Sequence, residues 1–208
     1  MSSAGCPGSL RGCPCPSRIR NKPDRGTRLR VPVLLERGAL PAGRAPAQAS
    51  FFDPAAAAAA SHALLTSQAG QDHAGQYAVL RAWDAALAAA GYDGPPVWLH
   101  GDLHPANILV NDGQVSGMID FGDITAGDPV GDLAVAWMLL PPGCHASFWS
   151  AYQAAGGRAG DALRARARGW ALNFAIVFLA HSEDDPVLRE VGRRTLSAVL
   201  EDQRGAAG

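Results

Sequence analysis

The stretch from residue 97 to residue 120 constrains the fold more than any other part of this sequence. An apolar run at 97–99 predicts a short strand, and two further strands are expected at 107–110 and 114–119. The Asn111-Asp112-Gly113 segment between the last two is a strong signal for a tight hairpin turn. The chain must therefore form a strand, an irregular loop and a hairpin in direct succession.

Polar side chains occupy regular places in this stretch. His100, Asp102 and Asn107 follow the order HxDxxxxN, and Asp120 comes directly after the hairpin. This layout is typical of a phosphoryl-transfer catalytic loop and the metal-binding turn that follows it. Because a hairpin returns the end of its second strand to the start of its first, we expect Asn107 and Asp120 to share one Mg²⁺ ion.

The remaining polar residues of the stretch have expected roles around these ligands. Asp102 is the candidate catalytic residue, since a carboxylate there would orient the acceptor hydroxyl and accept its proton. We expect His100 to bond to the loop backbone, and His104 either to border the acceptor or to face solvent. Asp123 is expected either to join the metal environment or to be an ordinary loop acid. Asp132 is expected to reach back and hold the loop.

The segments HGDLHPANILV, at 100–110, and GMIDFGDITAGDPVGDLA, at 117–134, resemble the aminoglycoside phosphotransferase family of small-molecule kinases. The resemblance implies an α+β, protein-kinase-like fold with a mainly helical carboxy-terminal lobe, here residues 51–204. It also implies Asp102 as catalytic base, Asn107 and Asp120 as magnesium ligands, and ATP as phosphate donor. The implied acceptor is a hydroxylated or aminosugar-like small molecule.

One part of the family pattern is not found. Family members carry an amino-terminal sheet lobe with a phosphate-contacting lysine, whereas Lys22 is the only lysine of this chain and lies in a low-complexity stretch. We therefore expect the sheet lobe to be missing or degenerate. Since positioning supplies much of the rate in phosphoryl transfer, we also expect impaired activity.

Residues 1–50 differ from the rest in composition. They hold nine Lys or Arg against two acidic residues, while the remaining residues hold nine against seventeen. Pro, Gly, Arg and Ser without a regular period predict a disordered basic arm. Two origins for this arm stay open: a native segment, or the product of a misplaced start codon or a frameshift. Because no aromatic residue lies among its arginines, we do not expect nucleic-acid binding.

Helices are expected on both sides of the central stretch. An alanine run at 55–60 predicts one, and residues 71–90 predict a second. The second has a mostly apolar stripe of Tyr77, Leu80, Asp84 and Leu87, with Trp83 beside it. Asp128 is expected to cap a single helix that ends at Pro141. Three more helices are expected near 145–155, 160–181 and 186–202.

The sequence also bears on the location of the protein and on alternative functions. The longest apolar run, at 170–180, is too short to span a bilayer, and the first residues lack a secretory apolar stretch, so a cytoplasmic protein without membrane contact is expected. One alternative is an inactive remnant or a binding module. Another is a metal-dependent hydrolase with His100, Asp102 and His104 as ligands, which leaves Asn107 and Asp120 without a role.

Overall fold

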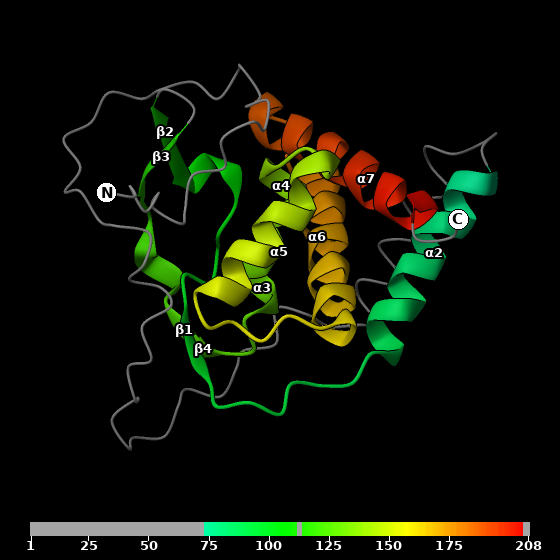
Figure 1. Cartoon of the computed structure of the whole chain (residues 1–208). Coiled ribbons are helices and arrows are strands. Elements are labelled where there is room, and N and C mark those ends of the chain that lie inside the picture. The colour runs from blue at the N-terminus through cyan, green and yellow to red at the C-terminus, as the bar shows by residue number, and fades with distance from the viewer. Residues whose placement is uncertain (1–72, 112–113, 206–208) are drawn as a thin grey trace, which may run out of the picture.

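The computed structural model describes residues 73–111 and 114–205, which form a block of helices with two small antiparallel sheets on one side (Figure 1). Three short 3₁₀ turns connect these elements: η2 Pro105–Asn107, η3 Phe121–Asp123 and η4 Pro142–Cys144. The strands are β1 Val97–Leu99, β2 Ile108–Asn111, β3 Gln114–Met118 and β4 Thr125–Gly127. The helices are α2 His73–Ala88, α3 Val130–Leu133, α4 Val135–Leu139, α5 His145–Ala154, α6 Asp161–His181 and α7 Pro186–Gly205.

The hairpin of β2 and β3 forms where the sequence predicts it. Ile108 pairs with Met118 and Asn111 with Gln114, and an irregularity in the register lies between Leu109 and Val110. The first predicted strand, β1, is also present. These predictions are confirmed because alternating side chains and a turn sequence act over a few neighbouring residues.

Strand β4 is not expected from the sequence. It pairs antiparallel with β1, so that Val97 lies opposite Gly127 and Leu99 opposite Thr125. Alanine and glycine are poor strand formers, and this pairing joins segments far apart in the chain. Its consequence is a closed loop: residues 100–124 leave the β1–β4 ribbon and return to it.

Helix α6 runs through the middle of the helical block and packs against α2, α3, α4 and α7 (Figure 1). Its buried face combines larger apolar residues with alanines that are completely buried, among them Ala167 and Ala171. Gly169 belongs to the same face, and a Cβ atom added to it would lie only 2.5 Å from the Cβ of Ala86 in α2. Small side chains therefore bring α2 and α6 unusually close.

The buried face of α2 is not the predicted one. The expected stripe is exposed, with Tyr77 at 66%, Leu80 at 38% and Leu87 at 48% of their full accessible areas. The helix buries Trp83, which the prediction placed beside that stripe, together with the small residues on its side. Hydrophobic spacing favours the larger residues, but the close approach to α6 leaves room mainly for the face that is rich in alanine. The buried residues are Ala78, Val79, Ala82, Trp83 and Ala86.

The remaining helices follow the prediction with one exception. Helices α5, α6 and α7 lie near their expected positions, and Asp185 caps α7, since its Oδ1 accepts from the N–H groups of Val187 (2.9 Å) and Leu188 (3.0 Å). The single helix expected after Asp128 is instead two short helices, α3 and α4, separated at Ala134. The predicted arm and alanine helix lie outside the described residues.

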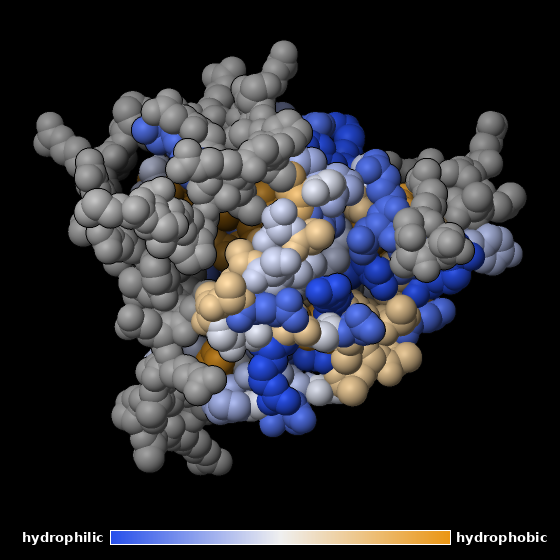
Figure 2. Space-filling view, in the orientation of Figure 1, coloured by the Kyte–Doolittle hydropathy of each residue, from blue (hydrophilic) through white to orange (hydrophobic). Residues whose placement is uncertain are grey.

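The surface of the helical block is mixed in character. On the face in Figure 2, hydrophilic residues alternate with smaller hydrophobic areas over the helices. In the part of the chain that the structure describes, no helix combines the length and the apolar character needed to cross a membrane.

Candidate active site

The closed loop between β1 and β4 contains the catalytic-loop sequence, the hairpin and the turn at Asp120. Its two ends cross at Gly101, whose φ of +88° lies in the left-handed region. A Cβ atom at this position would stand 2.0 Å from the backbone oxygen of Asp123. Glycine is required at residue 101 both by its backbone angle and by the approach of the η3 turn.

Asp132, in the first turn after β4, holds the start of this loop. Its carboxylate accepts hydrogen bonds from the backbone N–H groups of His100 (2.7 Å) and Gly101 (3.1 Å). Burial raises the pKa of Asp132, and these two bonds act in the opposite direction. The contact is the one that the sequence analysis predicts for Asp132.

His100 is completely buried and ties the loop to the end of β3. Its Nε2 lies 2.9 Å from the carbonyl oxygen of Ile119, which can only accept, so the proton is on Nε2. Nδ1 then accepts from the backbone N–H of Asp102 at 3.4 Å, and the ring packs on Phe121 with centroids 4.7 Å apart. His100 thus bonds to the loop backbone as expected.

Asp102 presents one side of its carboxylate to the surface. The side chain is 38% exposed, and its Oδ2 lies 3.4 Å from His104 Nε2 and 3.4 Å from Asn107 Nδ2. The backbone oxygen of Asp102 also accepts from Asn107 Nδ2, at 2.9 Å. Oδ1 has no hydrogen-bond partner among the described residues.

His104 is buried, which rules out the alternative that it faces solvent. Its Nδ1 accepts from the backbone N–H of Ala106 at 3.3 Å, and its ring stands edge-on to Phe178 of α6 at a centroid distance of 5.4 Å. Burial lowers the pKa of His104, while the nearby Asp102 carboxylate acts to raise it. The ring therefore lies beneath the surface, between the Asp102 carboxylate and α6.

Asn107 and Asp120 lie at neighbouring positions because the hairpin ladder continues one step beyond its strands. The backbone N–H of Ile119 donates to the carbonyl of Asn107 at 3.0 Å, and Asp120 follows at once. Asp120 has φ 64° and ψ 63°, a left-handed conformation that costs a residue with a side chain about 1 kcal/mol. Strain of this kind is common at functional turns.

These two residues fit a magnesium ion. Asn107 uses its amide nitrogen for the bonds to Asp102, which leaves its Oδ1 for a cation, and Asp120 is exposed. Mg²⁺ is commonly held by one or two protein oxygens together with waters and substrate phosphates. A buried amide oxygen and an exposed carboxylate, both hard donors, match that requirement.

Two further predictions concern metals. Asp123 is exposed, and within residues 73–111 and 114–205 its side chain has no bonded partner, so no contact joins it to the pair above. Over the same residues no three His, Cys, Asp or Glu side chains are grouped so as to hold a metal ion. The hydrolase with His100, Asp102 and His104 as ligands therefore lacks structural support.

Sequence reasoning missed the contact that anchors the end of the loop. Arg166 of α6 pairs with Asp128, with Nε 3.0 Å from Oδ2, and also donates to the carbonyl of Ala90. Asp128 accepts from Val130 N–H at 3.3 Å as well, close to its predicted capping role. The available signal was an arginine inside the mostly buried sequence of α6, where a charge needs a partner.

The chain matches one protein family and is similar to several solved structures. The model of the phosphotransferase enzyme family matches residues 33–170. The GDP complex of aminoglycoside 2'-phosphotransferase-IIIa is 17% identical over 74% of this chain and 51% of its own length, with a TM-score of 0.49. Macrolide 2'-phosphotransferase MphH from Brachybacterium faecium is 25% identical over 69% and 50%, with a TM-score of 0.40. No curated protein matches the chain significantly.

A third structure, of aminoglycoside phosphotransferase APH(4)-Ia with AMP-PNP and hygromycin B, is 18% identical over 74% of this chain and 52% of its own, with a TM-score of 0.44. The chain spans about half the length of these solved structures. The family match itself covers more than half of the chain and includes the whole loop from β1 to β4. The predicted resemblance and the kinase-like α+β class are thereby confirmed, and this chain belongs to the phosphotransferase enzyme family.

Proposed function

We propose that this chain provides the catalytic-loop half of a kinase that transfers the γ-phosphate of ATP to a hydroxyl group of a small molecule. The observation that carries the proposal is the closed loop between β1 and β4. It joins Asp102 to Asn107 by side-chain hydrogen bonds and, through the hairpin ladder, sets Asp120 next to Asn107. Because ATP is the donor, we place the reaction in the cytoplasm.

In this reaction Asp102 acts on the acceptor. Its free Oδ1 accepts the hydroxyl proton as the acceptor oxygen forms a bond to the γ-phosphorus. The bond from that phosphorus to the bridging oxygen breaks at the same time, and ADP leaves. The side chain of Asp102 is 38% exposed, so an acceptor can reach it.

Asn107 and Asp120 act on the donor. Their oxygens would hold Mg²⁺, which when bound neutralises charge on the phosphates of the nucleotide. The chain prepares this position in advance, since the backbone of Asp120 is already in its left-handed conformation and Asn107 is buried and bonded. Little reorganisation is then needed when the nucleotide arrives.

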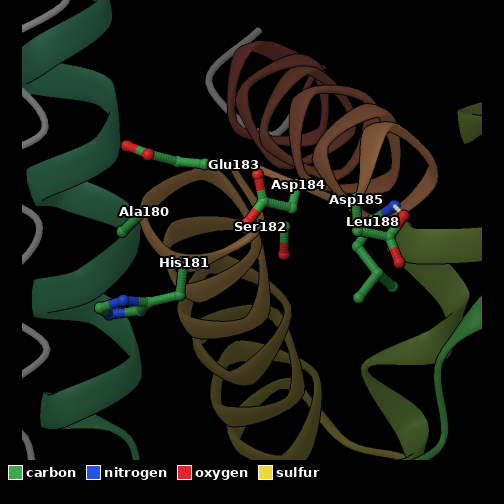
Figure 3. A pocket seen from close by; sticks show the side chains of 7 residues that line it. All are labelled: Ala180, His181, Ser182, Glu183, Asp184, Asp185 and Leu188. Carbon is green, nitrogen blue, oxygen red and sulfur yellow. Dashed lines mark hydrogen bonds between the residues drawn. The ribbon is translucent and has the colours of Figure 1, made fainter.

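An open hollow of about 470 Å³ at the connection between α6 and α7 is a candidate acceptor position (Figure 3). His181 and Glu183 extend to one side of the connection, and Asp185 and Leu188 lie on the other (Figure 3). Spread-out acidic groups favour an extended acceptor with several protonated amines. This supports an aminosugar-like molecule as acceptor. The lining residues are Ala180, His181, Ser182, Glu183, Asp184, Asp185 and Leu188.

We further propose that transfer by this chain is slow. Lys22 is its only lysine, so residues 73–205 supply no lysine to the phosphates. Among the described residues, donor positioning would then depend on the metal side of the site, and positioning accounts for much of the rate in phosphoryl transfer.

Calorimetric titration of the full chain with AMP-PNP tests the donor half of the proposal. We expect heat of binding only when Mg²⁺ is present. Asp120→Asn should abolish it, because asparagine tolerates the left-handed backbone but removes the charge. The matched control is Asp123→Asn, which should bind normally. A folded chain that shows no Mg²⁺-dependent binding would instead support the inactive remnant.

Transfer of labelled γ-phosphate tests the acceptor half. With a large excess of enzyme, we expect label on a multiply aminated, hydroxylated acceptor and little on a neutral polyol. Asp102→Asn should remove the transfer while leaving the binding of AMP-PNP intact. Equal labelling by the wild type and by Asp102→Asn would contradict the assigned role of Asp102.

A further inference from the structure

We propose that His104 is a positioning residue, which fixes the Asp102 carboxylate through its Nε2–H group. The inference rests on the proposed function, because it concerns the same carboxylate. His104 lies at the start of the η2 turn between Asp102 and Asn107, and its side chain is only 10% exposed. His104 therefore contacts Asp102 in the catalytic loop, but its ring is too buried for direct contact with the acceptor.

The hydrogen bonds of the ring decide which nitrogen carries the proton. The backbone N–H of Ala106 donates to Nδ1 of His104 at 3.3 Å. A backbone N–H can only donate, so Nδ1 is the bare nitrogen and Nε2 carries the hydrogen. Nε2 lies 3.4 Å from Oδ2 of Asp102 and also 3.4 Å from Nδ2 of Asn107. Because an amide nitrogen cannot accept a hydrogen bond, Oδ2 is the acceptor for the Nε2 hydrogen. Contacts of this kind are often long in unliganded sites and shorten in the reacting complex.

The same carboxylate oxygen has a second donor. Asn107 Nδ2 also lies 3.4 Å from Oδ2 of Asp102. Two donors on Oδ2 and no bonded partner on Oδ1, among the residues that are described, fix the rotation of the carboxylate. The free oxygen is then the one that meets the acceptor hydroxyl, which is the geometry that proton acceptance needs.

The ring of His104 also packs against an aromatic side chain of α6. Phe178 of α6 meets it edge-on, with an interplanar angle of 76° and centroids 5.4 Å apart. Phe178 lies two residues before Ala180, the first residue that lines the hollow at the end of α6. His104 therefore links the helix beside the candidate acceptor position to the carboxylate that would act on the acceptor.

Two variants of His104 separate positioning from packing. Leucine keeps an apolar side chain of similar size but has no donor, whereas the amide nitrogen of glutamine can replace Nε2–H. We expect His104→Leu to lower kcat for transfer on the order of tenfold to a hundredfold with little change in the KM for ATP. His104→Gln should recover most of that loss. Equal kcat in the wild type and His104→Leu, or equal losses in both variants that follow lost stability, would overturn the proposal.

A second measurement does not depend on activity, so failure of the proposed function can be told apart from failure of this inference. In the full chain labelled with ¹⁵N-histidine, long-range NMR correlations should identify His104 as protonated at Nε2 and bare at Nδ1. The Nε2–H signal should shift in Asp102→Ala. A ring protonated at Nδ1, or a signal that ignores the Asp102→Ala change, would exclude His104 as the partner of Asp102 even if transfer is absent.

Discussion

The loop between β1 and β4 and the helical block around α6 are stabilised in different ways. In the loop, single groups hold the chain: Asp132 binds two backbone N–H groups, and Gly101 permits a crossing that no other residue allows. In the block, the stability comes from many apolar contacts, and alanines such as Ala171 and Ala175 are fully buried. The loop should therefore be sensitive to a few specific changes, and the block to changes in volume.

The two regions meet at Arg166, which gives the largest expected effect. Its ion pair with Asp128 is mostly buried, with the two side chains 15% and 16% exposed. Arg166→Met would leave the Asp128 carboxylate buried without its partner and should lower the free energy of unfolding by about 3–5 kcal/mol, measured by urea denaturation.

The matched control for this change is Arg158→Met. Arg158 lies 3.8 Å from Asp93, but the side chains are 77% and 85% exposed, so the change should have little effect. Asp128→Asn combined with Arg166→Met should recover part of the loss. Equal destabilisation by the two arginine variants would show that burial of the pair is not what matters.

A second prediction tests the single-group character of the loop. Gly101→Ala should lower the free energy of unfolding by about 2–3 kcal/mol and weaken Mg²⁺-dependent nucleotide binding, because it adds backbone strain and a contact with Asp123. Gly156 also has a positive φ, of +93°, but open space around it. Gly156→Ala should therefore show the strain alone, about 1 kcal/mol, and no change in binding. If the two variants behave alike, the crossing at Gly101 is not tight.

A third prediction tests the volume limit in the helical block. Gly169→Ala gains helix propensity but places a Cβ 2.5 Å from that of Ala86, so a net loss of about 1 kcal/mol is expected in the free energy of unfolding. Gly131→Ala, in α3, has nothing within 4 Å and should be neutral or stabilising. Adding Ala86→Gly to Gly169→Ala should remove the clash. A stabilised Gly169→Ala protein would show that α2 can move away from α6.

The same difference decides what the sequence could predict. The order of His100, Asp102 and Asn107, the turn at Asn111 and the cap at Asp185 are encoded by neighbouring residues, so their positions follow from local rules. The resemblance to the phosphotransferase family rests on the same local segments.

Features that depend on distant partners could not be predicted in this way. Strand β4 forms because it pairs with β1. Arg166 can be buried because it forms an ion pair with Asp128, which comes from another part of the chain. The predicted buried face of α2 was wrong for the same reason. The hydrophobic pattern of the helix alone favours burial of Tyr77 over Ala82, but the close surface of α6 leaves room only for the smaller residue. Tertiary packing overrides local hydrophobicity where two backbones approach.

The smallest expected effect concerns pH and the helical block. Burial holds the pKa of His145 below its ordinary value of 6.5, although Asp202 acts against this. Within the described part of the chain, Nε2 of His145 has no hydrogen-bond partner. Between the lowered pKa and 6.5 the unfolded chain binds more protons than the folded one. The contribution of His145 is therefore complete above pH 6.5 and is lost as the pH falls through and below that value.

Measurements of the free energy of unfolding between pH 7.5 and about pH 5 test this sign. His145→Phe keeps a ring against Trp137, whose centroid lies 5.4 Å from that of His145, but cannot bind a proton. It should make the decline toward acid shallower without abolishing it, because burial also lowers the pKa of His104. If the pH dependence of the free energy of unfolding is the same in His145→Phe and the wild type, protonation of His145 inside the helical block costs little free energy.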